Sequence, residues 1–142
     1  MSDPDTETGY VLDRQVGFLL RRATQRHLAI FSSHIDDLTP TQFTALAQLC
    51  VLGRASQNAL GRATAMDGAT IKGVMDRLRR RGLVSAAPDE DDQRRLLLVP
   101  TEAGRALLAR RLPAARATTE ETLAPLDAAE RALLLDLLAR LG

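Results

Sequence analysis

Apolar residues in the middle of the chain recur at helical intervals. Between residues 69 and 81 they stand three and four positions apart, at Ile71, Val74, Met75 and Leu78. Such spacing places one buried stripe on a helix and leaves its other faces to solvent. A shorter helix is predicted over residues 57–63, capped by Ser56, and a turn at residues 65–68 joins the two helices. The pattern predicts a helix-turn-helix ending at Gly82, a residue that suits the left-handed position at a helix end.

The residues that follow Gly82 change period. Two short apolar runs, residues 83–87 and 96–99, flank a highly charged tip, and this arrangement predicts a β-hairpin. Residues 54–56 are a candidate third strand. A helix-turn-helix followed by a hairpin is typical of winged helix-turn-helix proteins, which read DNA. We therefore predict a mainly α fold with a small β-wing.

Longer apolar helical patterns flank this central region. Residues 11–35 predict a single first helix, and Thr39 caps a helix that begins at Pro40. Thr101 caps a helix that Pro113 should kink or break. Asp127 caps a last helix rich in leucine. The first and last of these helices are apolar on more faces than one chain can bury, so we predict N- and C-terminal dimerisation helices and a homodimer.

The predicted organisation is one compact domain in three consecutive parts. Residues 1–37 hold a polar tail, over residues 1–9, and the first dimerisation helix. Residues 38–101 form the winged helix-turn-helix, and residues 102–142 form the C-terminal dimerisation helices. The acidic, polar start of the sequence does not have the pattern of a signal peptide.

Charge is distributed unevenly along the chain. The net charge of the 142 residues is +1, but residues 53–82 hold seven basic and two acidic residues, a balance of +5. A local basic face on a nearly neutral protein is typical of a nucleic-acid interface. The alternative is an ordinary surface helix with a solvated basic face. From this region we predict DNA contacts by Asp67, Gly68, Thr70, Lys72, Gly73, Arg77 and Arg80.

Three segments resemble the MarR family, the multiple antibiotic resistance regulators. Residues 38–46 resemble the motif that opens a helix in that family, and residues 74–84 resemble the end of its recognition helix. The third segment comprises residues 92–94 with residues 101–104 at the family's spacing. The resemblance implies a dimeric winged-helix transcription regulator whose DNA affinity responds to a small molecule.

The resemblance also assigns roles in the wing. It implies that Arg94 enters the minor groove of double-stranded DNA, where the negative potential of a narrow groove favours arginine, and that Asp92 braces the wing tip. Where the family usually has leucine, this chain has Pro100, which removes a backbone donor from the last strand pairing of the wing.

Residues 9–31 resemble a MarR subgroup that regulates the breakdown of aromatic acids. This resemblance implies an effector that is a small aromatic carboxylate or its coenzyme A thioester. We expect a pocket between the first helix, the helix over residues 41–52 and the helix after Glu102. The predicted ligand-binding residues are Arg22, Arg26, His27, Phe31 and Phe43. For the two arginines and His27 the alternative is a surface or interface role, with Asp36 or Asp37 as partners.

The remaining sequence features exclude other classes of function. Cys50 is the single cysteine, which rules out an internal disulfide; because it lies among apolar residues, we predict a buried and unreactive thiol. No apolar run is long enough to span a membrane, which favours a cytoplasmic protein without a membrane partner. No spacing indicates a metal site, a cofactor or a nucleophile–base pair, so we predict no catalytic residues.

The predicted function is that of a regulator, most simply a repressor, that binds a palindromic operator as a dimer and is released by its effector. The alternative from another class is a winged-helix module that contacts protein and takes no small-molecule ligand.

Overall fold

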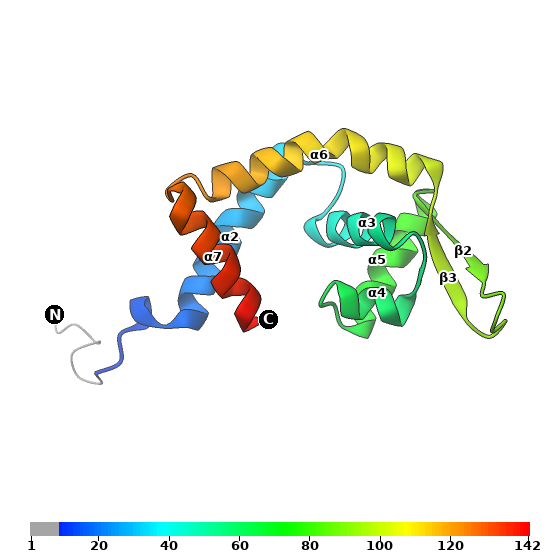
Figure 1. The fold of residues 1–142 in the computed structure, drawn as a ribbon, viewed down its shortest axis with the longest axis horizontal. Helices are drawn as coiled ribbons and strands as arrows, with labels where there is room; N and C mark the ends of the chain where they lie inside the picture. Colours follow the sequence, from blue (N-terminus) through cyan, green and yellow to red (C-terminus); the bar gives the residue numbers. More distant parts are fainter. Residues whose placement is uncertain (1–8) are drawn as a thin grey trace. The chain divides into compact units, whose positions relative to one another are not determined.

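The structure, a computed structural model, describes residues 9–142. Contacts group its elements into two compact units: residues up to His34 together with Arg116–Gly142, and Ile35–Ala115. The second boundary lies inside a helix, α6 (Glu102–Thr122), that runs on from one unit into the other (Figure 1). These limits differ from the segment limits predicted at residues 37 and 101, and the polar tail predicted over residues 1–9 lies almost wholly outside the described residues.

The unit formed by Ile35–Ala115 holds the central helices and the sheet. Its elements are α3 (Pro40–Leu52), β1 (Ala55–Ser56), α4 (Gln57–Ala63), α5 (Gly68–Arg80), β2 (Val84–Pro88), β3 (Leu96–Pro100) and the first part of α6. Helix α5 packs against α3 and α4. The largest fully buried side chains of this unit come from these three helices: Leu46, Leu49, Leu60, Ile71, Met75 and Leu78. The predicted helix-turn-helix and its buried stripe on α5 are confirmed.

The helix ends follow the predicted caps. Thr39 accepts from the Gln42 amide while the Gln42 side chain accepts from the Thr39 amide, a reciprocal capping box that satisfies two amides at the start of α3. Ser56 caps α4, and Asp127 caps α7 (Ala128–Leu141). Each of these side chains accepts a hydrogen bond from an amide in the first turn, and so determines where the helix begins.

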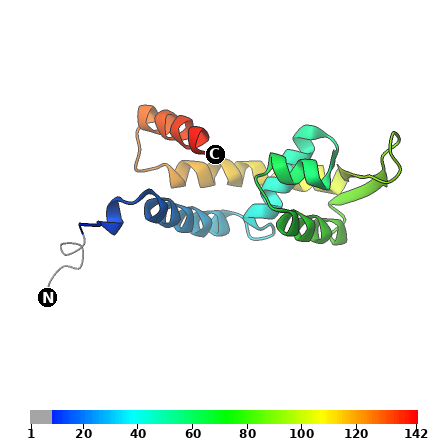
Figure 2. The same ribbon diagram turned by 90° about the horizontal axis from the view of Figure 1, so that it is seen from below.

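The wing is a three-stranded antiparallel sheet in the order β1-β3-β2, and its hairpin extends away from the helices of its unit (Figures 1 and 2). Its register pairs Ala55 with Leu98, and Val84 with Pro100. The doubt that the sequence raised about Pro100 is therefore resolved: it ends β3, and the next amide, that of Thr101, donates to the Leu83 carbonyl at 3.1 Å. The donor missing from proline is replaced one residue later.

The start of helix α6 lies in close contact with Gly82 and Leu83, the residues that follow the end of α5. Gly82 lies in the left-handed region at φ 72°, in the turn that follows α5. Its carbonyl accepts a hydrogen bond from the Thr101 hydroxyl at 2.7 Å. A Cβ atom added to Gly104 would lie only 2.1 Å from the Leu83 carbonyl oxygen. Glycine at position 104 is therefore required by a backbone-to-backbone approach rather than by backbone conformation.

The other unit is formed by η1 (Leu12–Arg14), α2 (Val16–His34), the last turns of α6 and α7. After α6 the chain turns back into α7 (Figure 2). Arg26, on α2, donates to the carbonyl oxygens of Glu121 at 2.9 Å and Thr122 at 2.6 Å, so it satisfies the open carbonyls at the end of α6. Arg131, on α7, donates to the carbonyls of Leu123 and Leu126 in the following turn.

Two helical predictions were wrong in detail. The first helix does not run unbroken from residue 11, because Gln15 is extended (φ −89°, ψ 133°) and separates η1 from α2. Pro113 was expected to kink or break α6; the break is wrong, because the helix continues to Thr122, and the kink stays a prediction. A proline removes one helical hydrogen bond, but here buried side chains on either side, Leu107 and Thr118, hold both halves of the helix in place.

Cys50 is only half-buried, which corrects the prediction of a buried thiol. It lies near the end of α3, where the neighbouring side chains of Val51 and Leu52 are 79% and 45% exposed. An apolar run at the end of a helix does not have to face the core, so the sequence neighbours of Cys50 were a poor guide. Partial burial still raises the pKa of the Cys50 thiol, with Arg105 opposing the shift.

Candidate nucleic-acid interface

The exposed surface of α5 carries most of the predicted DNA-contacting residues. Because Ile71, Val74, Met75 and Leu78 occupy the buried stripe, the remaining positions face outward. The side chains of Thr70, Lys72, Arg77 and Arg80 are exposed, and a Cβ atom at Gly68 or Gly73 would meet open space. The open, small-residue start of the helix leaves room for another molecule to come close to its backbone.

Asp67 has a structural role at the start of α5. Its carboxylate accepts from the Thr70 amide at 2.7 Å and caps the helix. Hydrogen bonds from Thr70 lower the pKa of the Asp67 carboxyl. The cap keeps this carboxylate occupied with the helix amides, so a DNA contact by Asp67 stays a prediction.

Asp76 contacts two of the basic residues on α5, Lys72 and Arg80. Lys72 pairs with the Asp76 carboxylate at 3.0 Å, one helical turn away, and Arg80 donates from Nε to the Asp76 carbonyl at 3.3 Å. The hydrogen bond from Lys72 is the main reason why the pKa of the Asp76 carboxyl is lowered. These exposed contacts are weak, so a phosphate can replace them at small cost.

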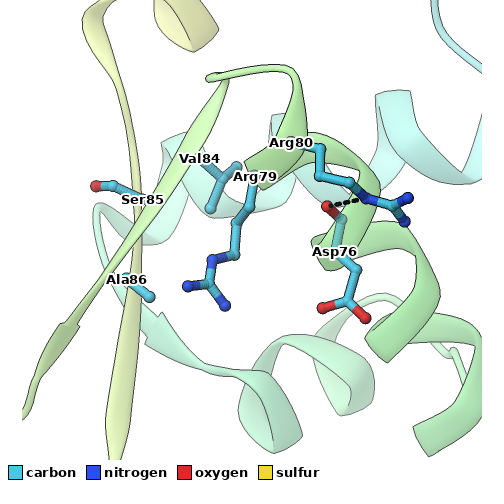
Figure 3. A pocket seen from close by; sticks show the side chains of 6 residues that line it. All are labelled: Asp76, Arg79, Arg80, Val84, Ser85 and Ala86. Carbon is cyan, nitrogen blue, oxygen red and sulfur yellow. Dashed lines mark hydrogen bonds between the residues drawn. The ribbon is translucent and has the colours of Figure 1, made fainter.

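A shallow groove of about 560 Å³ runs between the end of α5 and the edge strand β2. Its lining residues are Asp76, Arg79, Arg80, Val84, Ser85 and Ala86. In Figure 3 the Arg79 side chain extends into the space beside β2, while Arg80 lies over Asp76. With two guanidinium groups and one carboxylate that is already paired, the groove is suited to an anion such as a DNA phosphate.

The wing tip is stabilised by its own acidic residues. Asp92 Oδ1 accepts from the Arg94 amide at 3.1 Å and lies 3.5 Å from Arg94 Nε. Asp89 Oδ1 accepts from the Asp91 amide, and the Asp89 amide donates to the Arg95 carbonyl. Carboxylates used in this way shape the turn. The Arg94 side chain is 94% exposed, so it extends from the tip into solvent.

A second groove, of about 520 Å³, lies between α4 and the wing. Its lining residues are Ser56, Gln57, Asn58, Arg62, Arg94, Arg95 and Leu96. Of these only Arg94 belongs to the set predicted to contact DNA. Arg62 and Arg95 line the groove beside Arg94 but were not in that set, because no helical period or motif connects them; only the hairpin brings Arg95 close to α4. The local excess of basic residues was the one signal in the sequence that included Arg62.

The predicted ligand-binding residues have separate partners. Arg26 is engaged by the carbonyls at the end of α6, and the Arg22 guanidinium lies 5.7 Å from the centre of the Phe18 ring. His27 Nδ1 is 3.0 Å from the Thr122 hydroxyl. None of these contacts is with Asp36 or Asp37, so the alternative reading of the cluster named the wrong partners. Phe31 and Phe43 belong to different units, and the predicted pocket stays a prediction.

His27 lines an apolar groove of about 400 Å³ within the unit of α2 and α7. The groove is also lined by Leu20, Ala23, Thr24, Thr119, Thr122, Leu123, Leu134, Leu135 and Leu138. Its polar groups are His27 and three threonines, and the rest of the surface is aliphatic. Such a surface is suited to an apolar body that carries few polar atoms.

Among residues 9–142 no cluster of three or more His, Cys, Asp or Glu side chains could hold a metal ion. No helix of the same residues is long and apolar enough to cross a membrane.

Comparison with known proteins agrees with this arrangement. The HTH-type transcriptional repressor NicR of Pseudomonas putida is 44% identical over 142 residues, which cover 99% of this chain and 90% of NicR. The crystal structure of a probable transcriptional regulator from Pseudomonas aeruginosa, 52% identical, superposes with a TM-score of 0.91 over 93% of this chain and 100% of the other.

A third similar protein is Bordetella bronchiseptica BpsR, in a structure concerned with regulation of its DNA binding by 6-hydroxynicotinic acid. It is 41% identical, with a TM-score of 0.90 over 93% of this chain and 96% of BpsR. Residues 36–95, which span the helix-turn-helix, β1, β2 and the wing tip, match the MarR family. The chain is a transcription regulator of the mainly α, winged helix-turn-helix kind and belongs to the MarR family.

Proposed function

We propose that this regulator is a repressor that binds a palindromic operator as a homodimer. The observation that carries the proposal is the division of α5 into two faces. Ile71, Val74 and Leu78 are buried, and the opposite face combines an open start with exposed basic side chains. A helix built in this way can enter a major groove with its start at the base edges and its basic end along the phosphates.

Exposed apolar side chains support the dimer. On α2 the side chains of Val16, Leu19 and Leu20 are 63%, 45% and 41% exposed. On α7 the leucines are exposed to a similar or greater extent: Leu133, Leu135, Leu137, Leu138 and Leu141. Apolar surface of this extent on two helices of one unit favours burial against a second copy. A two-fold dimer would present its recognition helices to half-sites about 34 Å apart.

Base reading and phosphate binding should be separable on α5. We expect Thr70→Ala or Lys72→Ala to change which duplexes are preferred, because these residues lie at the open start of the helix. Arg80→Ala should weaken binding to all duplexes alike. It should also reduce the slope of log affinity against log salt by about one, because one phosphate contact is lost. The measurement is fluorescence anisotropy on a bound duplex and on single-base variants of it. Equal losses on every duplex for all three variants would contradict this division.

We further propose that the effector is an aromatic carboxylate or its coenzyme A thioester. BpsR, 41% identical to this chain, has DNA binding that is regulated by 6-hydroxynicotinic acid. In this chain His27 and three threonines contribute polar atoms to an otherwise aliphatic groove. An aromatic ring with one acidic or hydroxyl substituent matches a surface of that composition. Of the other predicted ligand contacts, Arg22, Arg26 and Phe31 belong to the same unit as this groove, and we keep them as proposed contacts; Phe43 belongs to the other unit, and its role stays a prediction.

The effector proposal is tested by release of bound DNA. Benzoates, hydroxycinnamates, nicotinates including 6-hydroxynicotinate, and their coenzyme A thioesters are titrated into the protein–duplex complex. We expect one class to lower duplex affinity about 5–150-fold, the usual range for coupling between two sites. His27→Ala should weaken this response without changing affinity in the absence of effector, and Gln25→Ala, on the same helix, serves as the control. Failure of every compound to release DNA or to raise the melting temperature would refute the aromatic effector.

A further inference from the structure

Asp37 joins three segments of the unit formed by Ile35–Ala115. It lies in the loop before α3, and its carboxylate accepts three hydrogen bonds from Arg111 of α6: Nε to Oδ1 at 2.9 Å and to Oδ2 at 3.1 Å, and Nη2 to Oδ2 at 2.6 Å. Its backbone carbonyl accepts from Arg81 Nη1 at 2.6 Å. Arg81 is the residue that caps the end of α5. One residue thus connects the end of the recognition helix to the middle of α6.

The Asp37–Arg111 pair is better defined than an ordinary surface ion pair. The two side chains are 31% and 33% exposed, and the planar guanidinium meets both carboxylate oxygens. A two-point contact of this kind fixes direction as well as distance. The hydrogen bond from Arg111 is also the main reason why the pKa of the Asp37 carboxyl is lowered, so the contact favours the charged form of the carboxyl.

The same end of α5 is held at a second place. The Thr101 hydroxyl donates to the Gly82 carbonyl, and Gly104 brings the backbone of α6 against Leu83. The packing of α5 against α3 and α4 sets its position, and this attachment holds the end of the helix against α6. The link through Arg81, Asp37 and Arg111 supplies a second attachment further along α6, so the end of α5 is held at two separated points.

We propose that Asp37 and Arg111 are positioning residues for specific DNA recognition: they fix the direction of α5 through Arg81. The inference rests on the proposed function of α5. Hydrogen bonds to base edges are directional, whereas attraction to phosphates tolerates small displacements. Loss of the link should therefore lower affinity for the preferred sequence more than affinity for DNA in general.

The experiment uses a duplex selected by the parent protein from a random pool, and a scrambled duplex of the same length. Asp37→Asn and Arg111→Gln should each weaken binding to the selected duplex about tenfold, equal to about 1.4 kcal/mol. Binding to the scrambled duplex and the salt slope should stay as in the parent. The matched control is Arg110→Gln, which removes the same charge at the adjacent position of α6. The double variant should be no weaker than either single one, because both act through one link.

A role confined to stability would give a different result: a lower unfolding midpoint, with the ratio of the two affinities unchanged in the folded protein. That unchanged ratio in both single variants overturns the proposal. Arg111→Lys keeps the charge but loses the two-point contact of the guanidinium, so it should give an intermediate ratio of the two affinities. This variant replaces Arg111→Gln if that protein does not fold. A ratio equal to the parent's in both Arg111→Lys and Asp37→Asn likewise overturns the proposal. Failure of the parent itself to bind any duplex would instead refute the proposed function.

Discussion

Gly104→Ala is expected to destabilise the protein by at least about 2 kcal/mol, more than any substitution of an exposed residue. The added methyl group would lie 2.1 Å from the Leu83 carbonyl oxygen, which is backbone and cannot rotate away. Either α6 must move off the end of α5, or the chain between them must shift. Urea unfolding followed by circular dichroism measures the loss as a lower midpoint.

The matched control is Gly73→Ala, in the interior of α5, where the new methyl group would meet nothing within 4 Å. Alanine loses less conformational entropy than glycine when the chain folds, so this substitution should stabilise the protein by about 0.5–1 kcal/mol. The two substitutions add the same group and should have opposite signs. Equal midpoints for the two variants would show that α6 does not approach Leu83 as closely as the structure has it.

Arg94→Ala is expected to lower affinity for a specifically bound duplex by about 1–3 kcal/mol, which is about a five- to 150-fold rise in Kd. The side chain is 94% exposed and its only contact with Asp92 is a long one of 3.5 Å, so the folded protein gains little from it. Its loss should therefore leave the unfolding midpoint unchanged while weakening DNA binding. Arg110→Ala, a change of the same kind on α6, should affect neither quantity.

Asp92→Asn gives a second test of the wing. The neutral side-chain amide can still accept from the backbone amide of Arg94, so the tip should keep its turn and the protein should lose only part of its affinity for DNA.

For Arg94→Ala, an affinity for DNA equal to that of the parent would contradict the prediction. It would remove the wing from the mechanism and leave α5 as the sole contact.

The parts of the fold that the sequence predicted are those set by local chemistry. The stripe at Ile71, Val74 and Leu78 had to face a core because no other face of that helix is apolar. Thr39, Ser56, Thr101 and Asp127 each accept from an amide at the start of a helix, as a side-chain oxygen in that position does.

The parts that the sequence did not predict depend on contacts between distant residues. The bond from Arg111 to Asp37 spans 74 positions and that from Arg81 spans 44, and no period or motif connects such residues. The same holds for Arg26, whose partners are the carbonyls at the end of α6 and not the acidic residues that the alternative to ligand binding named. Pro113 shows the reverse error: a strong local rule against proline in a helix was overridden by burial on both sides.

We expect α5 and the wing to bind DNA through phosphates and base edges, and the salt dependence of binding tests this most directly. Binding of the parent protein to a selected duplex is measured by anisotropy over a series of salt concentrations. With Arg77 and Arg80 on phosphates in both subunits, four contacts predict a slope of log affinity against log salt steeper than about −3. The alternative, a winged-helix module that contacts protein, predicts no selected duplex and no binding even at low salt. That result would contradict the account.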